Sequence, residues 1–181
     1  MEGNENIMDQ WLKGRSAKEQ QLLDALQNPN WEVRRDAAAS PDATELVLLE
    51  ALKDPNWRVR YAAACNANAT ADVLLVALRD KSRYVRAAAV RHGNVTEELL
   101  LIAMKDPDWR VRVAAVDNPR TTEQIVLLAA RDGDWRVRDA AADSPKVTEE
   151  AMQLLMHDFE PEVADTAFAN PYYREHSATI H

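Results

Sequence analysis

A spacing of 26 residues recurs along this chain and constrains its fold more than any other feature. A column of Asn or Asp keeps this spacing through five steps without an insertion, as from Asp54 to Asp80. The column consists of Asn28, Asp54, Asp80, Asp106, Asp132 and Asp158. Valine follows each member five positions later, and arginine follows the first five members six positions later. Such a period is typical of a solenoid, in which small units bury their apolar faces against their neighbours.

Each unit carries the start and stop signals of two helices. We expect the first helix to begin at the Asp column, because pairs such as Asp54-Pro55 combine an N-cap carboxylate with a proline at the first helical position. An alanine-rich run continues this helix, and a proline ends it in most units, as at Asn118-Pro119. A column of threonines is then expected to cap a second, leucine-rich helix. This column consists of Thr44, Thr70, Thr96, Thr122 and Thr148.

These signals predict an all-α, superhelical solenoid of about six 26-residue repeats with two helices each. Residues 28–171 would hold the tandem repeats. Residues 1–27 look like a partial N-terminal capping repeat, in which Ser16 and Glu19 fit a capping box. Residues 172–181 would form a C-terminal tail.

Composition argues against several functional classes. The single cysteine, Cys65, excludes an intramolecular disulfide and a zinc site built from cysteines. The histidines show no ligand spacing, so we expect no metal, no cofactor and no catalytic residues. No apolar run approaches the roughly 18 residues of a membrane span, and the first ten residues lack the features of a secretory signal. We therefore expect a cytoplasmic protein that is not an enzyme and does not bind membranes.

The Asp and Arg columns have two interpretations. They could form a row of charges that binds a ligand. Alternatively, each Asp could cap its own helix while it pairs with an arginine of the adjacent repeat. Residues six positions apart, such as Asp54 and Arg60, lie on different turns of one helix and are suited to reach a neighbour. This spacing favours a ladder between repeats.

A helical wheel of the first helix separates a core face from an exposed ridge. Val59 and Ala63 fall on the core face, whereas Arg58 and Tyr61 fall nearly opposite them, with Trp57 at the border. Repeated indole and guanidinium groups could stack nucleobases or clamp a peptide. Alternatively, each indole could cover the seam to the next repeat. The candidate binding residues on this ridge are Trp57, Arg58, Arg83, Tyr84, Trp109 and Arg110.

The second helix provides another candidate surface. Leu75, Leu101 and Leu127 fall in the middle of the face that should be solvated. If they are exposed, they form an apolar stripe that could bind a partner helix or a second copy. Alternatively, a curved and crowded helix could bury them more than the wheel suggests, or the helix could be partly 3₁₀, which would shift its phase.

The repeated unit resembles a known family. The segment DPNWRVRYAAACNANATADVLLVALR is similar to the leucine-rich repeat variant family, and the DPDWRVR start resembles HEAT-type repeats. This resemblance implies a right-handed superhelix of paired helices, one of which can be short or 3₁₀. It implies binding rather than a shared reaction. Family members can carry an N-terminal iron–sulfur module, but no cysteine precedes Cys65 here, so this chemistry does not transfer.

These observations predict a non-catalytic scaffold that binds a protein partner, or itself, through a helical face. The alternative is a nucleic-acid-binding solenoid that uses the Trp- and Arg-bearing central repeats. The net charge of −8 argues against this alternative. However, residues 54–131 carry a charge of +3 (12 basic minus 9 acidic residues), so the central repeats remain open to an acidic partner. The sequence leaves the oligomeric state open.

Overall fold

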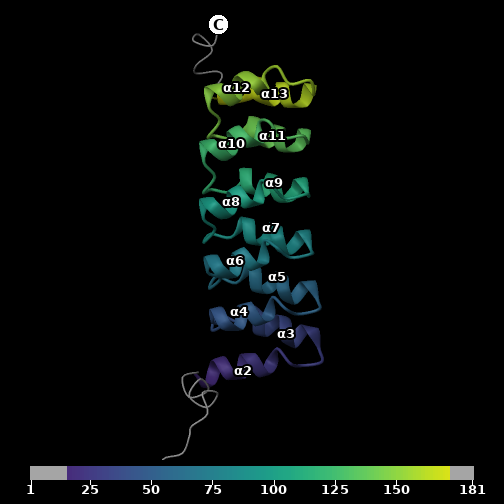
Figure 1. The fold of residues 1–181 in the computed structure, drawn as a ribbon, viewed down its shortest axis with the longest axis vertical. Helices are drawn as coiled ribbons and strands as arrows, with labels where there is room; N and C mark the ends of the chain where they lie inside the picture. The colour runs from purple at the N-terminus through teal and green to yellow at the C-terminus, as the bar shows by residue number, and fades with distance from the viewer. Residues whose placement is uncertain (1–15, 172–181) are drawn as a thin grey trace, which may run out of the picture.

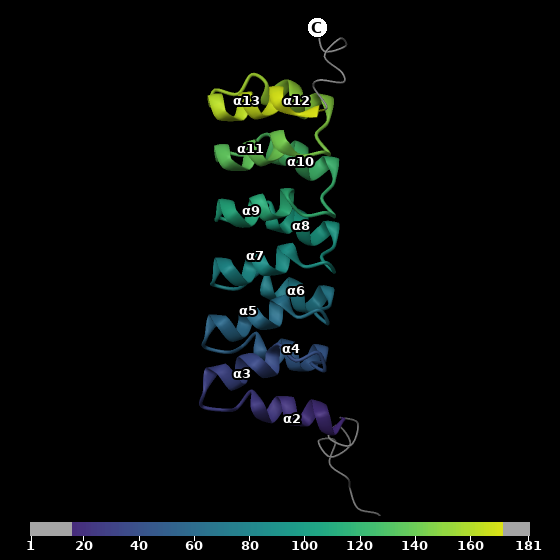
Figure 2. The same ribbon diagram turned by 180° about the vertical axis from the view of Figure 1, so that it is seen from behind.

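The computed structural model describes residues 16–171, which form twelve α-helices and no β-strand. The helices stack along one straight axis, with the first helices of the repeats along one edge and the second helices along the other (Figures 1 and 2). The first helices are α3 (Trp31–Ala38), α5 (Trp57–Cys65), α7 (Arg83–Arg91), α9 (Trp109–Val116), α11 (Trp135–Asp143) and α13 (Pro161–Ala169). The second helices are α2 (Ala17–Ala25), α4 (Glu45–Ala51), α6 (Ala71–Ala77), α8 (Glu97–Ala103), α10 (Glu123–Ala129) and α12 (Glu149–Leu155).

The predicted all-α repeat solenoid is confirmed. Each first helix packs against the first helices of the neighbouring described repeats, and those from α3 to α11 also pack against the second helix of their own repeat. Helix α2 packs against α3 and α4, and Ser16 caps it by accepting a hydrogen bond from the Glu19 amide at 3.1 Å. The predicted tail and most of the partial N-terminal repeat lie outside the described residues, so those domain boundaries stay predictions.

The first helix begins two residues later than we predicted. In the second repeat the N-cap is Asn56, whose side chain accepts a hydrogen bond from the Arg58 amide at 2.9 Å. Asp54 instead accepts from the Asn56 amide at 2.7 Å, which forms a turn ahead of the helix. Pro55 lies in this turn, because its fixed φ suits a turn as well as a first helical position.

The predicted ladder between repeats is present. Arg60 donates from Nε and Nη2 to the two carboxylate oxygens of Asp80 in the next repeat, at 2.6 and 3.0 Å. Its Nη1 donates to the backbone oxygen of Asp54 in its own repeat at 2.7 Å. One guanidinium therefore joins the turn ahead of the first helix in its own repeat to the equivalent turn of the next repeat. Its five rungs are Arg34–Asp54, Arg60–Asp80, Arg86–Asp106, Arg112–Asp132 and Arg138–Asp158.

A second ladder joins the ends of the first helices, and the sequence analysis did not predict it. Asn66 donates from Nδ2 to the backbone oxygens of Ala38 and Ser40 in the preceding repeat, both at 2.8 Å. Asn118 likewise reaches the oxygen of Val90 at 2.7 Å. These buried amides satisfy carbonyl groups that helix ends leave without a partner.

A threonine occupies the N-cap position of each second helix from α4 onward, as predicted, but Thr44 and Thr122 form no capping hydrogen bond through their side chains. Thr70 and Thr96 each accept a hydrogen bond from the amide three residues later, at 3.4 Å, and Thr148 does so at 3.3 Å. The inner faces of these helices supply the largest fully buried side chains, which include Leu48, Leu74 and Leu100. The core therefore runs between the two columns of helices for the length of the described chain.

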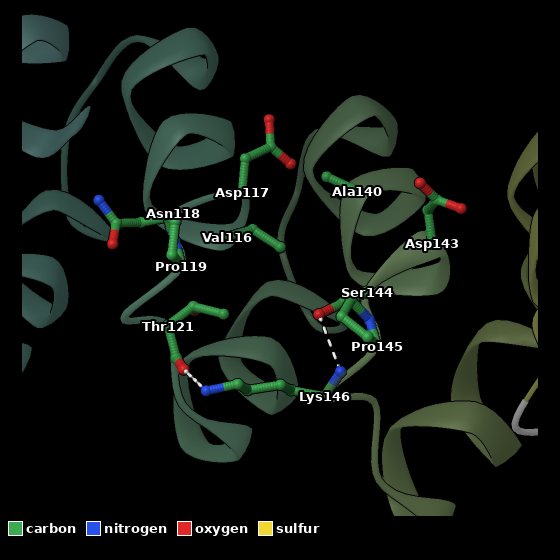
Figure 3. Close-up of a pocket in the computed structure, with 10 residues that line it drawn as sticks. All are labelled: Val116, Asp117, Asn118, Pro119, Thr121, Ala140, Asp143, Ser144, Pro145 and Lys146. Carbon is green, nitrogen blue, oxygen red and sulfur yellow. Dashed lines mark hydrogen bonds between the residues drawn. The ribbon is translucent and has the colours of Figure 1, made fainter.

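One buried position predicts a stabilising substitution. Thr121 is buried beside a pocket between two repeats (Figure 3), and its hydroxyl has no hydrogen-bond partner among residues 16–171. The equivalent positions in the adjacent repeats hold Val95 and Val147, both buried. Thr121→Val should raise the free energy of unfolding by about 1 kcal/mol, because it removes an unsatisfied polar group at nearly constant volume. Urea denaturation measures this change.

Thr148→Val provides the matched control for this substitution. The Thr148 hydroxyl accepts a hydrogen bond from the Ala151 amide at 3.3 Å, so its loss should destabilise the chain by about 1 kcal/mol. A destabilising effect of Thr121→Val would contradict the assignment of an unsatisfied hydroxyl.

Candidate functional site

The first helices of the central repeats bring aromatic and arginine side chains together on one face. The ring of Trp57 lies 6.2 Å from that of Tyr61 on the same helix, in an edge-on arrangement. It lies 5.3 Å from the ring of Tyr84 on α7. We call this surface the Trp–Arg face and define it as Trp57, Arg58, Tyr61, Arg83, Tyr84, Arg91, Trp109 and Arg110. It includes all six candidates from the first helices.

Three arginines of this face, Arg58, Arg83 and Arg110, lie over its rings. The guanidinium of Arg58 lies 4.9 Å from the ring centroid of Trp57 and 5.4 Å from that of Trp31 in the preceding repeat. Arg110 lies 4.4 Å from the ring centroid of Trp109. Stacking of this kind holds a flexible arginine in place and leaves its N–H groups free to bind an anion.

Both interpretations of the tryptophan column describe part of this arrangement. Trp57 and Trp109 are half-buried, and Trp57 contacts Tyr84 across the seam between repeats. The tyrosines keep more of their surface in solvent, since Tyr84 is 51% exposed and Tyr61 is 41% exposed. The indoles therefore cover the seams, while the tyrosines and guanidinium groups remain accessible.

Two hollows lie along the Trp–Arg face and share Tyr84. One has a volume of about 470 Å³ and is lined by Trp57, Arg58 and Tyr61 together with Arg35. The other has a volume of about 370 Å³. Its lining includes Arg83, Arg91, Trp109 and Arg110. Because they meet at Tyr84, the two hollows together extend over four successive repeats, from α3 to α9.

Positive charge on this face is only partly neutralised. Asp108 lies 3.6 Å from Arg83 and 3.5 Å from Arg110. Burial acts to raise the pKa of Asp108, but the hydrogen bond from the Arg110 amide and the two arginine charges outweigh it and lower this pKa. Arg58 and Arg91 form no ion pair with any residue in the range 16–171. Their charges are therefore available to a bound carboxylate.

The same face becomes acidic toward the C-terminus. Arg91 is followed at the repeat spacing by Asp117 and Asp143, and both line the pocket of Figure 3. Burial raises the pKa of Asp117, the charge of Arg91 acts to lower it, and the charge of Asp143 raises it further. The face therefore has a basic, aromatic part over α5–α9 and a carboxylate-lined part over α9–α11.

The single cysteine, Cys65, lies at the end of α5 beside Tyr61 of this face. Burial raises the pKa of the Cys65 thiol, and this effect exceeds the opposing effect of its hydrogen bond with Tyr61. A thiol with a raised pKa is a poor nucleophile at neutral pH. Among residues 16–171 there is also no group of three or more His, Cys, Asp or Glu side chains placed to bind a metal.

The leucine candidates of the second helices are half-buried. Leu75 and Leu101 pack against one part of the core, and Leu127 packs against the other. The structure thus favours the interpretation that a crowded helix covers them. The exposed apolar residues lie one position later in each helix, between 43% and 47% exposed. They are Val76, Ile102, Leu128 and Leu154.

Comparisons with known proteins agree with this architecture. The family model of the HEAT repeat matches residues 47–64, which cover most of α4 and most of α5. A solved structure described as a leucine-rich repeat variant with a novel repetitive structural motif superimposes with a TM-score of 0.67 and 26% sequence identity. This match covers 84% of the present chain and 60% of the other, so the chain spans less than two thirds of that structure. The search of curated proteins found no match. No helix in the described range is long and apolar enough to cross a membrane.

Proposed function

We propose that this chain, a HEAT-like helical-repeat protein similar to leucine-rich repeat variants, is a non-catalytic scaffold that binds an acidic segment of a protein partner. The binding surface is the Trp–Arg face. The observation that carries the proposal is the set of arginines stacked on aromatic rings beside two hollows that share Tyr84. The partner would act in the cytoplasm, where we expect the protein to reside.

The chemistry of this face suits a peptide with both acidic and apolar side chains. A guanidinium can donate two parallel hydrogen bonds to a carboxylate while its flat face rests on a ring. Arg58 offers such a stacked group and Arg91 offers a second guanidinium, both without a competing ion pair in the described chain. Tyr61 and Tyr84 offer exposed apolar surface between them. Because stacking already orders Arg58, binding costs less side-chain entropy than it would for a free arginine.

A nucleic-acid partner fits this face less well. The five ladder arginines are already paired with aspartates, so they cannot contact phosphates. Asp108 lies among the exposed arginines, and Asp117 and Asp143 continue the face. A long polyanion would therefore meet repelling carboxylates after about three repeats, whereas a short acidic segment would not.

A binding measurement with a defined probe tests this proposal. The probe is a fluorescein-labelled peptide of alternating Glu and Phe, and a matched peptide with Gln in place of Glu serves as its control. Arg58→Gln should weaken binding of the acidic peptide about tenfold, because it removes a charge-assisted contact. Fluorescence anisotropy measures the affinity.

The outcomes of this measurement separate the two partner classes. Arg79→Gln changes an exposed arginine on α6's side of the stack and should leave binding unchanged. Equal binding of the Glu and Gln peptides would contradict the proposal. A labelled oligothymidine that binds more tightly than the acidic peptide, with an affinity that falls steeply with salt, would favour nucleic acid instead.

A further inference from the structure

The second helices line the opposite edge of the stack from the first helices (Figures 1 and 2), and exposed apolar residues recur along them. We define the apolar stripe as Val76, Ile102, Leu128 and Leu154, one from each of α6, α8, α10 and α12. The equivalent position in α4 holds Glu50, so the stripe stops at that helix. A row of exposed branched side chains at a constant spacing is a common mark of a protein interface.

Charged columns flank the stripe on both sides. Residues four positions before and three positions after a helical residue lie on the same side of the helix. For Ile102 of α8, these are Glu98 in the first turn and Lys105, which lies in the turn two residues after the helix ends. The column at the starts of the helices consists of Asp72, Glu98, Gln124 and Glu150, and the column at their ends consists of Arg79, Lys105, Arg131 and His157. The apolar stripe therefore runs between an acidic and a basic column.

Much of this charge has no ion-pair partner within the chain. Arg131 pairs with Glu150 of the next repeat. In contrast, Asp72, Arg79, Glu98 and Lys105 are exposed and form no ion pair among residues 16–171. The part of the surface around Val76 and Ile102 thus offers apolar contact area with unpaired charges of opposite sign on its two sides.

We propose that the apolar stripe is the interface through which two copies of this chain form a dimer. The two copies run in the same direction, related by a twofold axis parallel to the stack. Rotation about this axis places the acidic column of one copy opposite the basic column of the other. It also places each repeat opposite its counterpart, so Ile102 meets Ile102 of the other copy and Glu98 faces Lys105.

The alternatives complement this surface less well. A twofold axis that runs across the stack would place the acidic columns of the two copies against each other, which repels. A second copy also shares the 26-residue spacing of the stripe, so its apolar residues stay in register over all four helices. This interface leaves the Trp–Arg face uncovered, and the proposed dimer is independent of the function proposed above.

Sedimentation velocity of the full chain over a range of concentrations tests the interface. Ile102→Glu combined with Leu128→Glu should raise the dimer dissociation constant at least about a hundredfold, because each change acts twice in a symmetric dimer. Tyr84→Glu, on the Trp–Arg face, is the matched control and should dimerise like the unchanged chain. A chain that stays monomeric at millimolar concentration would overturn the proposal, as would a double variant that still dimerises.

A charge exchange tests the orientation. Glu98→Lys alone and Lys105→Glu alone should each weaken dimerisation, because each brings like charges together. An equimolar mixture of the two variants should restore it, since both contacts in the mixed dimer then join opposite charges. Circular dichroism confirms that each variant keeps its helices. If the mixture associates no better than either variant alone, the parallel arrangement is wrong.

Discussion

Asp80→Ala is expected to lower the free energy of unfolding by about 3–5 kcal/mol, which is the effect of removing one partner from a buried ion pair. Arg60 is only 4% exposed, and two of its hydrogen bonds go to the Asp80 carboxylate. Without that carboxylate, the guanidinium stays buried with an unbalanced charge. Asp80 also accepts a hydrogen bond from the Ser82 amide, so its turn loses a contact as well. Urea denaturation followed by circular dichroism measures the loss.

Two further variants distinguish the ladder from a surface charge effect. Glu50→Ala removes the partner of Lys53 from an exposed pair and should cost less than about 1 kcal/mol. Arg60→Met combined with Asp80→Ala removes both buried charges and should recover most of the stability, because an apolar side chain tolerates burial. If Asp80→Ala costs no more than Glu50→Ala, the ladder does not hold the repeats together.

Leu100→Ala is expected to destabilise the chain by about 2–5 kcal/mol, as for other fully buried leucines. Leu100 is fully buried in the middle of the stack. The next two residues give a graded comparison on one helix. Leu101 is half-buried against the core, so Leu101→Ala should lower the free energy of unfolding by about 1–2 kcal/mol. Ile102→Ala, on the exposed side, should stay within about 0.5 kcal/mol in the monomer.

This series also tests the position of the apolar stripe. The wheel placed Leu101 at the centre of the solvated face, whereas the structure places Ile102 there. Equal and small effects at both positions would show that Leu101 is as exposed as Ile102. The exposed apolar row would then consist of Leu75, Leu101 and Leu127, as the wheel predicted. Denaturation at low protein concentration separates the stability of one chain from any contribution of self-association.

The repeat period was enough to predict the fold, because every unit carries the same signals in the same register. The ladder also followed from sequence, since Asp and Arg columns at a fixed offset have few other uses in a solenoid. The helix start was wrong by two residues because Asp54-Pro55 fits a turn as well as a helix start, and Asn56 then supplies the cap. The amide ladder of Asn66 and Asn118 has no local signal, because its partners are backbone groups 26–28 residues away.

The candidate site was predicted in part. The wheel correctly grouped Arg58 with Tyr61 on the exposed side of α5. It could not place Trp57 against Tyr84, because that contact depends on how one repeat is rotated onto the next. The second helices from α4 onward have seven residues each, which is two turns, so one residue of error in phase exchanges Leu101 for Ile102.

The two ladders give the molecule a strictly local construction. Every side-chain hydrogen bond given above between repeats joins residues at most 28 positions apart. Such a chain has a low contact order at any length, so its folding can start in one unit and spread to the next. Among the described residues, none of these hydrogen bonds joins repeats that are far apart in the stack, so none holds the two ends together against a pulling force. Pulled from its ends, the stack should therefore yield in steps, each of which frees one 26-residue unit with a contour length of about 90 Å.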